Sequence, residues 1–358
     1  MPRTTILEEE ALCGRFPAAP PSDDRRKPMK KYVFLVFGLL MFAACGSDNA
    51  ADSANQQVTY EPTATSSLAT AMPEPEEAAE GEAPAETDED SQPDEAVTEN
   101  YPTAIVSLSP TATEMLFAVG AGGQVIAVDD FSYYPPEAPV VEGLSGWNPN
   151  VESIASFEPD LVVLSDSGVQ EELELLGIEV FVAPAAVDLD DVYMQMLSLG
   201  ELTGNERTAG DAVLSMQAAI GEIIAGIEMS SEPLTYFHEL DDTLYSVTSS
   251  TFIGQIYAMT GLKNIADPAD EDGAAWGYPQ LSEEFILQAD PDLIFYADAQ
   301  CCAQSLSTIS ARPGWSELSA VRNGNIFEMD SDISSRWGPR LVDFLETVSD
   351  AVTTVNAR

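Results

Sequence analysis

The side chains best suited to chemistry are aromatic residues in two loops, together with three charged residues and a tryptophan near the C-terminus. They are Phe131, Tyr133, Tyr134, Trp147, Trp276 and Tyr278 in the loops, and Asp332, Arg336, Trp337 and Arg340 beyond them. Aromatic side chains in loops rich in Pro and Gly suit a cleft for a bulky, partly apolar ligand. The alternative is that they cover the cores of folded lobes. As a set they favour the cleft, and the chemistry they indicate is non-covalent binding.

Residues for catalysis or metal binding are sparse. A hydrolase needs a nucleophile, a base and an orienting group, but the single histidine, His238, follows a predicted strand at 234–237. The sequence contains neither Gly-x-Ser-x-Gly nor a Gly-rich phosphate loop with lysine. The adjacent Cys301 and Cys302 cannot supply a closed tetrahedral metal site. The sequence therefore predicts no enzyme, no resident cofactor and no metal centre.

A repeated unit positions these loops. Glu152 and Glu284 each begin the pattern Glu-x-Ile-x4-Pro-Asp-Leu, which an apolar run follows. Asn150 and Ser282 stand where a side chain caps a helix, and each glutamate falls in the first helical turn. The proline ends the helix, and the apolar run is typical of a buried strand. The repeat therefore predicts two α/β lobes.

Further patterns give the two halves the same order. Strands are expected at 104–108, 125–128 and 244–247, and helices at 111–119 and 251–260, the latter capped by Ser249-Ser250. Helical patterns at 189–202 and 206–227 lie between the halves. The predicted fold is α/β: two Rossmann-like lobes joined by a single long helix, with a ligand cleft between the lobes.

The N-terminal region has the pattern of an export signal. Met29-Lys30-Lys31 and an apolar run over 32–44 precede Cys45, as in a bacterial lipoprotein signal, and Met29 is a candidate true start. We expect a leader over 1–44, lipidation of Cys45 and an acidic tether over 45–100. We then expect an N-terminal lobe over 101–188, a bridging segment over 189–230 and a C-terminal lobe over 231–358.

Charge and cysteine content narrow the partners. The formal net charge of −47 makes nucleic acid a poor partner, because phosphate binding needs clustered Lys and Arg. The acidity fits high solubility or a salty or acidic habitat. In an oxidising compartment Cys301 and Cys302 can form a vicinal disulfide, or they remain two thiols in a loop.

From about Tyr101 to the C-terminus the chain resembles the solute-binding proteins of ABC importers for ferric siderophores, haem and vitamin B12. The matching segments are Ile105-Val106-Ser107-Leu108-Ser109-Pro110-Thr111-Ala112-Thr113-Glu114, Tyr134-Pro135-Pro136, the two Glu-x-Ile units, Arg312-Pro313-Gly314-Trp315 and Gly338-Pro339-Arg340-Leu341. The resemblance implies that Glu152 and Glu284 dock onto arginines of a permease. It also implies that the ligand contacts Phe131, Trp147, Tyr278, Asp332 and Arg336. At the position of Tyr278, Trp276 is a competing choice. Tyr133, which lies in the same loop as Phe131, is a further candidate for the ligand site.

These observations together predict an exported, lipid-anchored, monomeric protein that delivers a ferric siderophore or corrinoid to an ABC permease and its ATPase. Few basic residues are available for an anionic siderophore, which favours a neutral or cationic ligand such as a corrinoid. The alternatives are a haem-binding member of the same family, a surface sensor or adhesion lipoprotein on this fold, and, third, an extracellular enzyme.

Overall fold

The computed structural model describes residues 101–228 and 232–358. The expected leader over 1–44, the lipidated Cys45 and the tether over 45–100 lie outside the described residues. Below, the N-terminal lobe denotes residues 101–188 and the C-terminal lobe residues 232–358.

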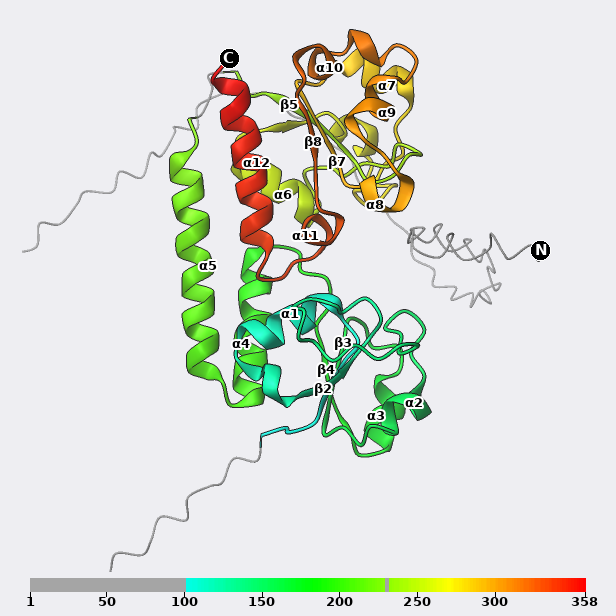
Figure 1. The fold of residues 1–358 in the computed structure, drawn as a ribbon, viewed down its shortest axis with the longest axis vertical. Helices are drawn as coiled ribbons and strands as arrows, with labels where there is room; N and C mark the ends of the chain where they lie inside the picture. Colours follow the sequence, from blue (N-terminus) through cyan, green and yellow to red (C-terminus); the bar gives the residue numbers. More distant parts are fainter. Residues whose placement is uncertain (1–100, 229–231) are drawn as a thin grey trace, which may run out of the picture. The chain divides into compact units, whose positions relative to one another are not determined.

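The N-terminal lobe is built on a four-stranded parallel sheet (Figure 1). Its strands, in the spatial order β2-β1-β3-β4, are β1 (Ile105–Ser107), β2 (Val125–Val128), β3 (Leu161–Leu164) and β4 (Glu179–Val182). Its helices are α1 (Pro110–Ala118), α2 (Val151–Ala155) and α3 (Gln170–Leu175), and a 3-10 turn spans Ala121–Gln124. The strands expected at 104–108 and 125–128 and the helix expected at 111–119 are confirmed.

The C-terminal lobe repeats this arrangement. Its parallel strands, in the order β6-β5-β7-β8, are β5 (Thr235–Glu239), β6 (Lys263–Asn264), β7 (Leu293–Tyr296) and β8 (Ile326–Glu328). Its helices are α6 (Phe252–Met259), α7 (Glu283–Ala289), α8 (Ala299–Cys302), α9 (Leu306–Ser310), α10 (Ser319–Asn323), α11 (Ser331–Ser335) and α12 (Leu341–Asn356). Short 3-10 turns span Asp267–Asp270 and Trp315–Glu317. The predicted α/β fold with two parallel-sheet lobes is confirmed.

Two helices connect the sheets: α4 (Leu189–Thr203) and α5 (Glu206–Gly226). The side chain of Asp188 caps α4, and Gly204 ends it in the left-handed conformation (φ 73°) that glycine adopts without strain. Helix α4 packs on α1 of the N-terminal lobe, and α5 packs on α12 of the C-terminal lobe. At 21 residues, α5 is about 30 Å long. The two helical patterns read from the sequence agree with these helices to within a residue at each end.

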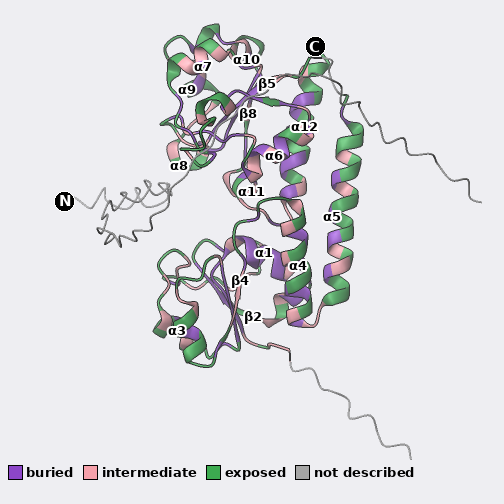
Figure 2. Ribbon diagram, turned by 180° about the vertical axis from the view of Figure 1, so that it is seen from behind, coloured by how far each residue is buried: buried purple, intermediate pink, exposed green. Residues whose placement is uncertain are grey.

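Alternate residues along the strands enter different hydrophobic cores. In the N-terminal lobe, Ile105 and Leu161 face one cluster, and Val106 and Val162 face another. The first cluster continues through α4, α5 and α12 to β5 and β7 of the other lobe. Figure 2 shows the buried residues gathered on the strands, whereas α5 carries many exposed residues. Each sheet is therefore covered on both faces, as its apolar strands predict.

The repeated unit has the same local structure in both lobes. Asn150 caps α2 by accepting the backbone N–H of Ser153, and Ser282 caps α7 by accepting that of Phe285. The residues before the two prolines, Glu158 and Asp290, have φ of 52° and 45°, outside the right-handed helical region. The predicted caps and helix ends are therefore confirmed.

One predicted strand and one predicted cap are wrong. Residues 244–247 form a loop instead of a strand, because their backbone bonds to the 277–281 loop: Ser246 N–H donates to the Pro279 carbonyl and Thr248 N–H to that of Gly277. The first strand of this lobe is β5, which contains His238. Helix α6 is capped by the side chain of Thr251, not by Ser249-Ser250.

Candidate ligand site

The aromatic side chains selected from the sequence lie at the surface. Trp147 and Trp276 are 79% and 84% exposed, and Phe131, Tyr133, Tyr134 and Tyr278 also retain large exposed areas. Exposed large apolar side chains that cluster are typical of interaction sites. The alternative, that these residues cover lobe cores, does not fit this exposure.

A carboxylate holds each aromatic loop in place. Asp129, just after β2, accepts hydrogen bonds from the backbone N–H groups of Phe131 and Gly146 and from the Ser132 hydroxyl. Burial raises the pKa of Asp129 above its usual range although these bonds oppose the shift. In the C-terminal lobe, Asp270 accepts from the backbone N–H groups of Ala275 and Gly277, each at 2.7 Å. Each loop is therefore held by a carboxylate of its own lobe.

The N-terminal loop contacts the C-terminal lobe directly. The Tyr133 hydroxyl donates to the Asp332 carboxylate, and burial followed by this bond raises the pKa of Tyr133. The other Asp332 oxygen lies 2.9 Å from the Arg336 guanidinium, which also donates to the Phe131 carbonyl at 3.2 Å. Four of the predicted ligand residues are thus joined in one network: Phe131, Tyr133, Asp332 and Arg336.

Glu114 on α1 anchors this network from beneath. It is 3% exposed, and its carboxylate accepts from Arg336 at 2.9 Å and from two nitrogens of Arg340 at 2.9 and 2.6 Å. The Arg340 guanidinium also lies 4.1 Å from the ring centre of Tyr134. The paired Arg340 geometry is the strong, charge-assisted kind. Glu114 therefore binds α1 to the segment between α11 and α12.

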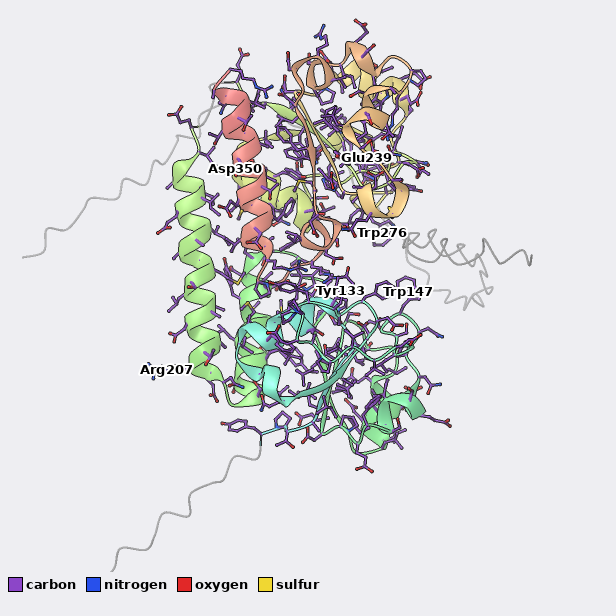
Figure 3. All side chains as sticks on the ribbon, viewed as in Figure 1. Tyr133, Trp147, Arg207, Glu239, Trp276 and Asp350 are labelled. Atoms are coloured by element: carbon purple, nitrogen blue, oxygen red, sulfur yellow. The ribbon has the colours of Figure 1, made fainter. Side chains whose placement is uncertain are left out.

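A cavity of about 240 Å³ lies beside the second aromatic loop. Trp276 and Tyr278 line it together with Trp337, the start of α6 and residues 185–187, which precede α4. The Nε1 atom of Trp337 is buried there without a hydrogen-bond partner among the described residues. Figure 3 shows Trp276 on the edge of the C-terminal lobe toward the N-terminal lobe, with Tyr133 and Trp147 on the opposing edge.

The structure thus divides the predicted ligand residues into three groups. Phe131, Tyr133, Asp332 and Arg336 belong to the inter-lobe network, and Trp276 and Tyr278 belong to the cavity. Trp147 stands exposed on the N-terminal lobe. The sequence interpretation gave no role to Glu114, Asp129 or Asp270. Glu114 carried a signal, because it is the one charged residue of α1.

His238 is not placed for catalysis. It is fully buried, its Nδ1 lies 2.7 Å from the Tyr257 hydroxyl, and burial lowers its pKa to about 3. Next to it in the sequence, the buried Glu239 accepts two hydrogen bonds from Arg312. A neutral imidazole closed off from solvent cannot serve as a base for an external substrate.

Two further pairs of predicted residues can be located. Glu152 and Glu284 are exposed, in the first turns of α2 and α7. Cys301 and Cys302 lie on α8 with their Sγ atoms 2.8 Å apart. A disulfide between these cysteines stays a prediction, and so does the docking role of the two glutamates.

Within residues 101–228 and 232–358, no group of three or more His, Cys, Asp or Glu residues is arranged to hold a metal ion. Over the same ranges, none of the helices combines the length and the apolar character needed to cross a membrane.

Comparisons with known proteins agree with this architecture. Residues 105–333 match the family described as periplasmic binding proteins. An uncharacterized ABC transporter substrate-binding lipoprotein of Bacillus subtilis is 30% identical over 276 residues, which make up 74% of this chain and 85% of that protein. A cobalamin-binding protein of Halobacterium salinarum is 29% identical over 268 residues, or 71% of this chain and 70% of that protein.

Solved structures share the fold. The periplasmic vitamin B12-binding protein of Vibrio cholerae superposes with a TM-score of 0.58 at 24% identity, covering 72% of this chain and 99% of that one. A periplasmic haem-binding protein of the same species gives a TM-score of 0.61 at 20% identity, covering 69% and 98%. At such identities the likeness concerns the fold and leaves the ligand open.

Proposed function

Since this chain belongs to the periplasmic binding protein family, we propose that it binds a corrinoid outside the cytoplasm and delivers it to an ABC importer. The observation that carries the proposal is the set of exposed aromatic side chains on both lobes, beside a cavity lined by Trp276 and Tyr278. Flat aromatic surfaces suit a large, partly apolar ring system.

The size of the cavity indicates how such a ligand would be held. Sites for small molecules usually enclose about 300 to 1,000 Å³, more than the roughly 240 Å³ present here. A corrinoid would therefore extend from the cavity onto the exposed aromatic residues of the N-terminal lobe. Phe131, Tyr133, Trp147, Asp332 and Arg336 are the contacts we assign to that part.

The names of related proteins support the same ligand class. The Halobacterium relative is named a cobalamin-binding protein, and a relative from Pectobacterium atrosepticum, 30% identical over 251 residues, is named a vitamin B12-binding protein. Haem is the second candidate, because haem-binding proteins share the fold. A ferric siderophore rich in carboxylates is disfavoured by the ion pairing of the nearby arginines.

The remaining parts of the proposal concern delivery. Glu152 and Glu284, one exposed glutamate in each lobe, are the contacts for the permease, whose ATPase drives import. Cys45 is the lipid attachment site, and the acidic segment after it is the tether. The protein acts as a monomer and catalyses no reaction; a surface sensor or adhesion role on this fold would need no permease contact.

Ligand titration tests the binding role. Tryptophan fluorescence of the full chain is followed against cyanocobalamin, haemin and a panel of ferric siderophores. We expect saturable binding of cyanocobalamin and a loss of at least about tenfold in affinity for Trp276→Ala, because a bound corrinoid would cover this exposed ring and remove it from water. Leu175→Ala, which removes an 80% exposed apolar side chain from α3, is the matched control and should bind normally. If only haemin binds saturably, haem replaces the corrinoid as the assigned ligand. If none of these ligands changes the fluorescence, the proposed binding role is refuted.

A further inference from the structure

Basic residues are rare from residue 101 onward, and each of them lies in the part of the chain that the structure describes. Residues 101–358 hold seven basic and forty-one acidic residues. Four of the seven lie apart both from the inter-lobe network and from the buried pair of Glu239 and Arg312. Arg207 is in the first turn of α5, Lys263 begins β6, Arg322 is on α10 and Arg358 bonds to Asn325, just before β8.

The other three basic residues are each bound to a buried glutamate. Arg312 donates to Glu239, which is 0% exposed, and Arg336 and Arg340 share Glu114. Arg336 has a second acidic partner in Asp332 at 2.9 Å. In the inter-lobe network two guanidinium groups therefore face two carboxylates, and the formal charges cancel.

This pairing has a consequence for any anionic ligand. A carboxylate entering beside Tyr133 would have to draw a guanidinium away from Glu114, and a buried carboxylate left without its partners is strongly unfavourable. The arginines are thus held in place by Glu114 and are not available to neutralise a charged ligand. An uncharged ligand can still accept single hydrogen bonds from their remaining N–H groups.

We propose that Glu114 determines the charge preference of the site, because by neutralising Arg336 and Arg340 it favours uncharged chelates over those that carry carboxylates. The inference rests on the proposed function, since it assigns the ligand to this inter-lobe site. Glu114 touches the arginines and not the ligand, so it acts as a positioning residue for specificity.

Glu114→Gln is the direct test. Glutamine keeps the shape and one acceptor oxygen but removes the charge, which leaves one guanidinium charge uncompensated. In calorimetric titrations of the full chain, we expect affinity for uncharged cyanocobalamin to change less than threefold. Affinity for haemin, which carries two propionates, should rise at least tenfold. The gain should shrink as salt increases, which a purely structural effect would not produce.

Two further variants keep the test decisive. Glu222→Gln removes an exposed charge from α5 and should leave both affinities unchanged. If Glu114→Gln fails to fold, Asp332→Asn removes the second negative charge of the same network and should raise haemin affinity in the same direction. If Glu222→Gln raises the affinity for haemin as much as Glu114→Gln does, the gain comes only from the change in net charge and the inference is overturned.

The outcomes separate the inference from the proposed function. Wild-type protein that binds cyanocobalamin, with no haemin gain in either network variant, overturns the role of Glu114 and leaves the corrinoid assignment standing. Wild-type protein that prefers haemin overturns both. If the wild type binds neither ligand and the variants gain affinity for haemin, the role of Glu114 is supported and only the corrinoid assignment is overturned.

Discussion

Asp298 lies just after β7, beside the buried pair of Glu239 and Arg312. Burial, followed by the negative charge of Glu239, raises the pKa of Asp298 to about 8. At neutral pH this carboxyl group therefore holds a proton in the folded protein. The three side chains together then carry one negative charge, on Glu239, and one positive charge, on Arg312. A second ionised carboxylate there would leave the single guanidinium of Arg312 facing two negative charges.

The raised pKa makes stability depend on pH in a definite direction. Between about pH 4, where an unfolded aspartate titrates, and pH 8, the folded chain holds a proton that the unfolded chain has released. The contribution of Asp298 to stability is thus largest below pH 4 and declines as pH rises to about 8.

Asp298→Asn should remove this dependence. We expect the variant to match the wild type near pH 4 and to be more stable at pH 8, by at least about 1 kcal/mol. Denaturant unfolding at pH 4.5, 6 and 8 measures the difference. Asp350→Asn, an exposed carboxylate on α12 (Figure 3), is the control and should show no such trend. If the free energy of unfolding changes with pH in the same way for wild type and Asp298→Asn, the raised pKa of Asp298 is contradicted.

Residue types alone selected side chains for the candidate site, but they did not indicate the contacts between these side chains. Tyr133, Asp332 and Arg336 were each selected as ligand residues, yet Tyr133 and Asp332 are 199 positions apart and nothing local indicates that they bond. The sequence indicated no ion pair for Glu114, because a glutamate in a helix is ordinarily solvated. Its burial becomes apparent only when α1 and the segment before α12 are brought together.

At the scale of elements, the repeat specifies more than a helix followed by a strand. Asp160 accepts from the backbone N–H groups of Thr103 and Ala104, just before β1. Asp292 accepts from the backbone N–H of Thr235 at 2.8 Å and from its hydroxyl at 2.9 Å, at the start of β5. In both lobes the aspartate of Pro-Asp-Leu therefore fixes the backbone where the neighbouring central strand begins.

Removing this aspartate should weaken the start of the central strand. Asp292→Ala is expected to lower the free energy of unfolding by about 1 to 2 kcal/mol, because a backbone donor loses a charged acceptor. Asp292→Asn keeps one acceptor oxygen and should cost less. Because Asp160 and Asp292 lie in separate sheets, the costs of replacing both should add. Denaturant unfolding measures these values, with Asp211→Ala on the exposed surface of α5 as control. Equal losses of unfolding free energy on replacing Asp160, Asp292 and Asp211 would argue against a specific role for the aspartate of the repeat.

Elements with long or repeated patterns were predictable, and the exceptions have a physical cause. The helices of the bridge and the repeated unit follow from capping, periodicity and proline. Residues 244–247 have the apolar composition of a strand, but their backbone bonds to a loop at 277–281. Composition describes how well a segment suits a sheet and does not identify the neighbour that receives its hydrogen bonds.

At the scale of the whole molecule, the duplication gives each lobe an exposed glutamate at the same position. Glu152 and Glu284 occupy equivalent first-turn sites, and Figure 1 places α2 and α7 at opposite ends of the two lobes. A permease that contacts both glutamates would be held at two separate points. Two linked contacts strengthen each other, because the second forms within an existing complex.

This geometry predicts how charge reversal acts on uptake. Glu152→Arg and Glu284→Arg should each reduce ligand uptake partially, and the double variant should abolish it, because opposite charges at both ends steer and orient the encounter. Uptake by vesicles that contain the cognate permease and ATPase measures the effect, and titration of the same variants should show unchanged ligand affinity. Glu171→Arg, an exposed first-turn residue of α3 outside the repeat, is the matched control. If ligand affinity falls together with uptake, the glutamates support the fold of each lobe and do not form the permease contact.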